Sequence, residues 1–225
     1  MSRGAAAENA GEPVVGQDDA VLCRWLATLL SAELDEDTLA SYRRGDAGPL
    51  FDLLRERGLS EASSRVEKAL KGLVLLPEPR LELAADFAEL FLVDGRSAAP
   101  PYASLYTEPA ARLHGEAAAR MEARLAAAGF AVKDGVGEPA DHLAVMLDYL
   151  ASALESASPA ADSKIGSMAG SKEGGETPGA FIRAELSPWL PALARRCERV
   201  STASDFYPAV VALASAYVDW LSQNQ

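Results

Sequence analysis

Cysteine, histidine and long apolar runs are scarce in this chain of 225 residues. The two cysteines, Cys23 and Cys197, belong to no CxxC motif, so the thiol pairs of a zinc knuckle or a disulfide framework are missing. The two histidines, His114 and His142, form no HExxH pair. We therefore expect buried free thiols and no metal or other cofactor. No apolar stretch approaches the roughly 18 residues of a membrane span, so we expect a soluble protein.

The motifs of common enzyme sites are also missing. There is no GxxxxGK[ST] loop and no GxGxxG motif after a strand, so both common routes to nucleotide binding lack their backbone amides. Carboxylate pairs such as Asp134 with Glu138 could perform acid–base chemistry, but such pairs are common on surface helices. The sequence therefore predicts no catalytic residue and no enzyme.

Basic residues are outnumbered, since 33 acidic residues face 21 basic ones and the formal net charge is −12. This excess repels phosphate backbones and argues against nucleic acid as a partner. It favours a basic partner peptide, although acidity that only keeps the protein soluble explains the same charge. Residues 1–17 lack the apolar segment of a secretory signal, so we expect a disordered tail there and a protein that stays in the cytoplasm.

Strand-forming residues are sparse as well, because alanine and leucine dominate the apolar fraction. Apolar residues recur at helical spacing along most of the chain after residue 17, most clearly at Leu143, Met146, Leu147, Leu150 and Leu154. No convincing strand and no internal repeat is present. The predicted fold is all-α, a single helical bundle of about ten helices over residues 18–225.

Two interruptions divide this helical pattern. The segment 130–137 is short and contains glycine. It is the expected hinge if the bundle consists of two subdomains. Residues 156–177, SASPAADSKIGSMAGSKEGGET, offer almost nothing to bury and predict a flexible loop. We expect Pro109 in the first turn of the helix before the hinge and Pro139 at the first helical position after it.

Two segments concentrate unusual residues, and each has two interpretations. In EPADHL at 138–143, Glu138 could simply cap a helix whose dipole stabilises the charge of Asp141 in the first turn, with His142 an ordinary side chain. Alternatively, Asp141 and His142 line a groove, where an acceptor and a switchable donor hold a basic or polar peptide. In PPYASLY at 100–106, the tyrosines either contact a peptide or pin a long loop to the bundle.

The order of these segments resembles the TorD/DmsD family of redox-enzyme maturation chaperones. The similar segments are DFAELF at 86–91, PPYASLY at 100–106, EPADHL at 138–143, LSPWLPAL at 186–193 and DFYPAVVALA at 205–214. The resemblance implies an all-α cytoplasmic chaperone that binds the twin-arginine signal peptide of a molybdopterin-dependent oxidoreductase. Such a chaperone holds the apoenzyme until its cofactor is inserted and so delays its export.

The resemblance also implies a set of site residues and an assembly. The implied signal-peptide-binding residues are Pro101, Tyr102, Ser104, Tyr106, Glu138, Asp141 and His142. Some family members have Trp in place of Tyr102, and residues 156–177 are longer than the family pattern implies. A monomer and a domain-swapped dimer are both expected forms. Two other functions stay open: a regulatory helical adaptor for another protein, and a weak GTP-binding or GTP-hydrolysing protein.

Overall fold

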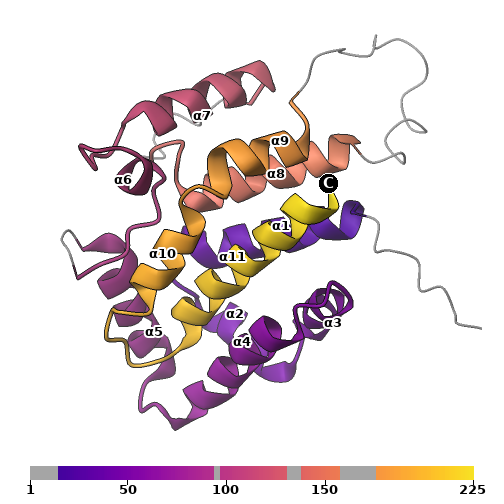
Figure 1. The fold of residues 1–225 in the computed structure, drawn as a ribbon. Helices are drawn as coiled ribbons and strands as arrows, with labels where there is room; N and C mark the ends of the chain where they lie inside the picture. The colour runs from indigo at the N-terminus through magenta and orange to yellow at the C-terminus, as the bar shows by residue number, and fades with distance from the viewer. Residues whose placement is uncertain (1–14, 94–96, 131–137, 158–175) are drawn as a thin grey trace, which may run out of the picture.

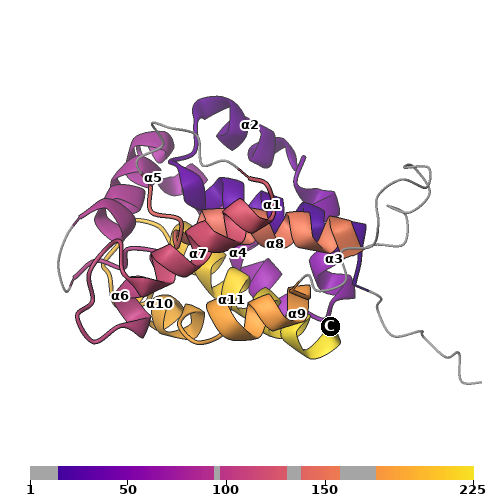
Figure 2. The ribbon, with the colours of Figure 1, turned by 90° about the horizontal axis from the view of Figure 1, so that it is seen from above.

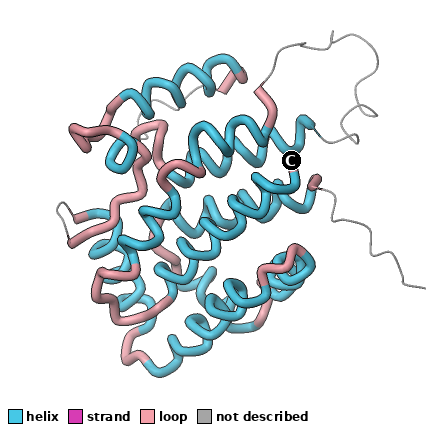
Figure 3. Tube along the Cα trace, in the orientation of Figure 1, coloured by secondary structure: helices cyan, strands magenta, loops and turns pink. Residues whose placement is uncertain are grey.

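The structure is a computed structural model of the chain and describes residues 15–93, 97–130, 138–157 and 176–225. Within these ranges all regular elements are helical, apart from one isolated β-bridge between Tyr102 and His142 (Figure 3). The α-helices are α1 (Gln17–Ser31), α2 (Glu36–Arg44), α3 (Gly48–Glu56), α4 (Ser60–Gly72), α5 (Pro79–Phe87), α6 (Ser104–Thr107), α7 (Glu116–Ala127), α8 (Leu143–Ala157), α9 (Pro178–Phe181), α10 (Leu190–Cys197) and α11 (Phe206–Asn224). The predicted all-α fold is confirmed for these residues.

Three short helical turns extend this set. The 3-10 helix η1 (Leu73–Leu75) follows α4, and the π-helical turns η2 (Ala88–Leu92) and η4 (Ile182–Leu186) continue α5 and α9. The sequence pattern predicts α4 with η1, and α5 with η2, as single continuous helices. In each pair the buried face continues, at Leu73 in η1 and at Leu90 in η2, while the backbone hydrogen bonding changes near the end.

Helices that are distant in the sequence form the centre of the bundle. Helix α1 packs along α8, and α11 lies against α4 and α10 (Figures 1 and 2). The side chains of α11 are buried over most of its length, from Phe206 to Leu221. This explains why the sequence of α11 is apolar on several faces, since a helix inside a bundle has neighbours all round.

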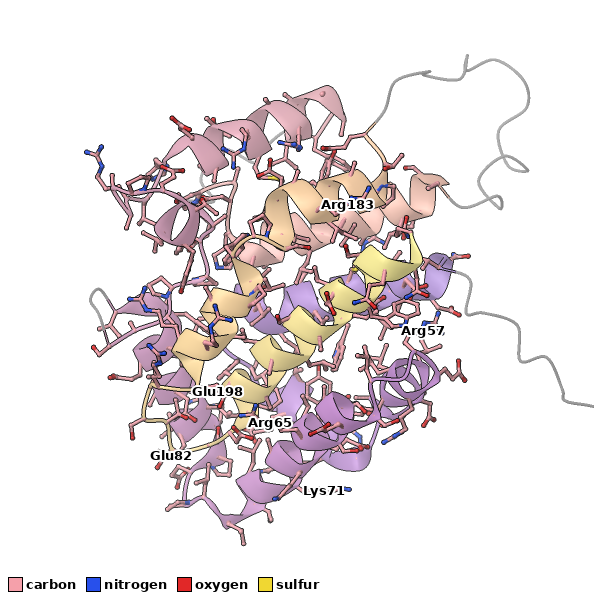
Figure 4. All side chains as sticks on the ribbon, in the orientation of Figure 1. Arg57, Arg65, Lys71, Glu82, Arg183 and Glu198 are labelled. Carbon is pink, nitrogen blue, oxygen red and sulfur yellow. The ribbon has the colours of Figure 1, made fainter. Side chains whose placement is uncertain are left out.

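A buried ion pair fastens α1 to the rest of the bundle. The Asp19 carboxylate accepts hydrogen bonds from Arg57 Nε at 3.0 Å and from the Tyr217 hydroxyl at 2.9 Å. The guanidinium of Arg57, which is labelled in Figure 4, also lies over the Trp220 ring, 5.7 Å from its centroid. A buried carboxylate without partners is strongly destabilising, so these contacts hold α1 in register with α11.

Local sequence signals set several helix ends. The Asp35 carboxylate accepts the Thr38 amide at 2.7 Å and caps α2, which Gly45 ends with a φ of 88°. Gly129, with a φ of 79°, follows the end of α7 as the sequence predicts. These signals act within one helical turn, which is why the sequence locates these ends.

Two predicted helix starts are wrong. Pro109 does not begin a helix, because the Glu108 carboxylate caps α7 seven residues later by accepting the Ala117 amide at 2.9 Å. Pro139 lies in a turn, and α8 begins only at Leu143. In both places a side-chain acceptor, Glu108 for α7 and His142 for α8, binds an amide of the first turn.

The predicted tail, hinge and long loop fall mostly outside the described residues, which exclude 1–14, 131–137 and 158–175. At their described edges the segments are shorter than predicted. Gln17 already belongs to α1, and α8 includes Ser156. On the far side of the loop, Glu176 pairs with Arg124 at 2.8 Å. The hinge at 130–137 stays a prediction.

Both cysteines are free and buried, which confirms the predicted thiols. Burial raises the pKa of Cys23 and of Cys197, so neither thiol is a reactive thiolate at neutral pH. No helix within the described ranges combines the length and the apolar character needed to cross a bilayer.

Candidate functional site

The proline–tyrosine loop and the EPADHL segment meet at the start of α8. The Leu143 amide donates to the Pro101 carbonyl at 2.8 Å, and the Ala103 amide donates to the Asp141 carbonyl at 3.1 Å. Tyr102 and His142 face each other in this antiparallel bridge. Two segments that the sequence singles out separately therefore form one site.

Asp141 lies beneath this bridge, with its side chain fully buried. Its Oδ2 accepts the backbone amide of Ser104 at 2.8 Å, at the first residue of α6. Asp141 Oδ1 and Ser104 Oγ are also buried, and neither has a hydrogen-bond partner among the described residues. A buried polar atom without a partner costs about 1–3 kcal/mol, so packing alone does not account for an aspartate and a serine at these positions.

His142 caps α8. Its Nδ1 accepts the Ala144 amide at 3.2 Å, and the ring is only 7% exposed. Burial lowers the pKa of this imidazole, and the charges of Glu138 and Asp141 oppose the change. The ring also meets the Tyr102 ring edge-on, with centroids 5.0 Å apart. His142 is therefore a neutral capping residue whose Nδ1 serves as an acceptor.

Tyr102 and Glu138 form the outer edge of the site. The Tyr102 hydroxyl donates a hydrogen bond to the Glu138 carboxylate, which is exposed, whereas the tyrosine is half-buried. Burial, followed by the hydrogen bond and the charge of Glu138, raises the pKa of Tyr102. The hydroxyl therefore stays protonated and holds the carboxylate at the surface, where a cation of another molecule can reach it.

Tyr106 adds a second aromatic side chain to the site. Residues of α10 and of the segment just before it contact this ring. Its ring stacks on buried Trp189 with centroids 5.5 Å apart, and Arg196 lies over the Tyr106 ring at 5.8 Å. The Tyr106 hydroxyl donates to the Pro100 carbonyl at 3.1 Å. The sequence alone does not assign Trp189 or Arg196 to the site, although the LSPWLPAL segment contains Trp189.

The seven residues that the sequence implies divide by exposure. Four are buried: Pro101, Ser104, Asp141 and His142. Three reach the surface: Tyr102, Tyr106 and Glu138. The structure brings the set together, but only the second group is open to direct contact with another molecule.

The site reaches the surface through Tyr102, Tyr106 and Glu138. Two grooves elsewhere on the molecule, of about 970 Å³ and 700 Å³, are lined by other residues. Within the described part of the chain, no group of three or more His, Cys, Asp or Glu side chains could hold a metal ion. The arrangement offers one surface carboxylate and two partly exposed aromatic rings on a backbone that buried hydrogen bonds hold in place. Such a surface suits the binding of a peptide.

Similarity to known proteins identifies the family. The family model for the nitrate reductase delta subunit matches residues 52–195. The chaperone protein TorD of Vibrio cholerae serotype O1 (strain Classical Ogawa 395) is 36% identical over 206 residues, covering 91% of this chain and 90% of its own length. This chain belongs to the TorD/DmsD family.

A second relative agrees. The chaperone protein TorD of Histophilus somni is 35% identical, over 83% of this TorD-family chain and 87% of its own. Both relatives are named as chaperones, which supports the prediction that this TorD-family protein is not an enzyme. A crystal structure of a proposed redox enzyme maturation protein from Archaeoglobus fulgidus aligns over 95% of the chain and 98% of its own, with 20% identity and a TM-score of 0.49.

Proposed function

We propose that this protein is a cytoplasmic chaperone that binds the twin-arginine signal peptide and the apo form of a molybdopterin-dependent oxidoreductase. It assists cofactor insertion and delays export of its client. Besides the family, one observation supports the proposal: the Glu138 carboxylate is held at the surface by Tyr102. A twin-arginine leader combines paired guanidinium groups with an apolar segment, and a carboxylate beside aromatic faces accepts both.

The proposed site residues act in two ways. Tyr102, Tyr106 and Glu138 contact the leader directly. The buried residues Pro101, Ser104, Asp141 and His142 are positioning residues, since their hydrogen bonds set the backbone that carries the tyrosines. The net charge of −12 attracts a basic leader before it docks, so added salt should slow association more than it weakens the final contacts.

Calorimetric titration with the leader peptide of the client oxidoreductase tests this proposal. We expect Glu138→Gln to weaken binding about two- to ten-fold, because it removes one exposed charge partner of the arginines. Glu122→Gln, at an exposed position on α7, is the matched control and should bind like the wild type. Equal affinity in Glu138→Gln and wild type would remove Glu138 from the site, and a wild type that ignores the leader would refute the function.

A core variant separates folding from recognition. Leu147 is fully buried in α8, so Leu147→Ala should lower the free energy of unfolding by about 2–5 kcal/mol. Because the side chain lies on the inner face of the helix, the folded fraction should still bind the leader with wild-type affinity. Lost affinity in folded Leu147→Ala would mean that the site depends on the core of α8 rather than on its surface residues.

A further inference from the structure

One corner of the bundle exposes large apolar side chains. In η1, Val74 is 73% exposed and Leu75 is 85% exposed, and Leu81 at the start of α5 is 53% exposed. Single exposed apolar residues are ordinary, but neighbouring ones beside a groove are typical of interaction sites. This corner lies in α4–α5, away from every residue of the proposed leader site.

A groove of about 700 Å³ adjoins this corner, between α2, α3 and the end of α4. Its apolar lining comes from Tyr42, Ala47, Phe51, Leu70, Val74 and Leu76. The Tyr42 hydroxyl is already engaged, because it accepts Trp25 Nε1 at 2.9 Å. No buried side-chain atom without a hydrogen-bond partner lines the groove in the described structure. The groove therefore has apolar area to offer but no polar group that would orient a small ligand.

The rim of this groove is basic, although the protein as a whole is acidic. Arg43 and Lys71 line the groove and are exposed. Neither takes part in an ion pair within the described residues, whereas the rim carboxylate of Glu67 is paired with Arg55 at 2.5 Å. Lys71 lies near the C-terminal end of α4 (Figure 4). Two cations that have no carboxylate partner among the described residues thus flank an apolar groove on a chain of net charge −12.

We propose that this groove, with Val74 at its edge, binds an amphipathic helix of a partner protein whose apolar stripe is flanked by aspartate or glutamate. The apolar stripe contacts the groove floor, and the carboxylates pair with Arg43 and Lys71. A helix fits better than an extended peptide, because the described residues present no strand edge that could pair with one. A helix satisfies its own backbone hydrogen bonds and offers side chains at i, i+3, i+4 and i+7 to a groove.

The groove and the proposed leader site have no residue in common. Helices α3 and α6 lie at opposite ends of the molecule in both views (Figures 1 and 2). Helix α3 borders the groove, and α6 carries Ser104 and Tyr106 of the leader site. Binding at one place can therefore be measured without blocking the other.

Two synthetic peptides test the proposal on the full chain. Each is a helix of about 18 residues, or five turns, with the same leucine stripe, flanked by glutamate in one peptide and by lysine in the other. Fluorescence anisotropy measures the affinity of each labelled peptide. The lysine peptide is the control for general attraction to an acidic protein, and it can also bind the proposed leader site. Saturable binding of the glutamate peptide supports the proposal, and failure of the glutamate peptide to bind overturns it.

Variants then locate the contact. Arg43→Glu combined with Lys71→Glu should weaken binding of the glutamate peptide about three- to ten-fold or more. The matched control Lys68→Glu, exposed on α4 but outside this groove, should not. Val74→Ser should weaken binding of the glutamate peptide about three- to ten-fold through lost apolar contact. If the double variant and Lys68→Glu weaken binding equally, the groove is not the site.

The double variant also separates this inference from the leader-binding function. Arg43 and Lys71 lie outside the proposed leader site, so leader affinity should stay at the wild-type value in the double variant. The double variant could keep its helical circular dichroism spectrum and yet bind neither the glutamate peptide nor the leader. That result would overturn the assignment of the groove as an independent surface.

Discussion

The Asp141 carboxylate accepts the backbone amide of Ser104 at 2.8 Å, across 37 residues of chain. Both residues are fully buried, and the Ala103 amide bonds to the Asp141 carbonyl immediately beside this contact. One aspartate thus fixes the turn that carries Tyr102 and Tyr106. Asp141 therefore holds the aromatic loop in place, and we propose that its contribution to binding passes through that loop.

Asp141→Ala should therefore affect both stability and leader binding. We expect the free energy of unfolding to fall by about 1.5–3 kcal/mol, because a buried bond to a charged acceptor is lost. Asp141→Asn should cost less, since an amide oxygen can still accept the Ser104 amide. Urea denaturation and titration of the leader measure the two effects.

Asp148→Ala is the control for this prediction. Asp148 is exposed on α8, and its ion pair with Arg24, at 3.4 Å, has both side chains largely in solvent. Such a pair contributes at most about 1 kcal/mol. A loss in Asp141→Ala no larger than in Asp148→Ala would contradict the anchoring role.

A second buried carboxylate ties α5 to the start of α11. Asp86 accepts the Ala203 amide at 2.6 Å, and its Oδ2 accepts the amide and the hydroxyl of Ser204 at 2.9 Å and 2.6 Å. We expect Asp86→Ala to lower the free energy of unfolding by about 2–4 kcal/mol, because three donors lose a charged acceptor. Exposed Glu89→Ala, three residues later, should change it by no more than about 0.5 kcal/mol. Similar melting temperatures for the two variants would be incompatible with this anchor.

Some features of the fold depend only on residues that are neighbours in the chain. Helical periodicity located the buried face of α8, and Asp35 and Gly45 located the ends of α2, because these signals act between neighbours in the chain. The buried role of Asp86 is not local, since its first hydrogen-bond partner lies 117 residues away. No local pattern distinguishes a carboxylate that binds distant amides from one that faces water.

The candidate site also combines local features with contacts between distant segments. Its two segments could be singled out, because each combines proline with aromatic or ionisable residues. Their meeting could not be derived from spacing, since it depends on the bridge between Tyr102 and His142. The burial of Asp141 also depends on this bridge. The stacking of Tyr106 on Trp189 arises from a third segment that only packing brings into place.

Acid should destabilise the start of α8 through His142. Burial lowers the pKa of His142 in the folded protein, below the value of about 6.5 for an unperturbed histidine. Above that value the imidazole is neutral in both states, and its capping bond to the Ala144 amide contributes fully. As the pH falls below it, the unfolded chain takes up a proton before the folded protein does, and stability is lost by at most about 1.4 kcal/mol per pH unit.

Denaturation of wild type and His142→Asn between pH 7 and 5.5 measures this effect above the range in which most carboxylates titrate. Asparagine can still accept the Ala144 amide but does not titrate, so the variant should lose less stability than wild type over this interval. His114→Asn is the matched control, because His114 is exposed, and asparagine tolerates its φ of 57°; this variant should follow the wild-type curve. If His142→Asn also follows that curve, protonation of His142 does not destabilise the start of α8, and the ring must be able to leave its cap without cost to the fold.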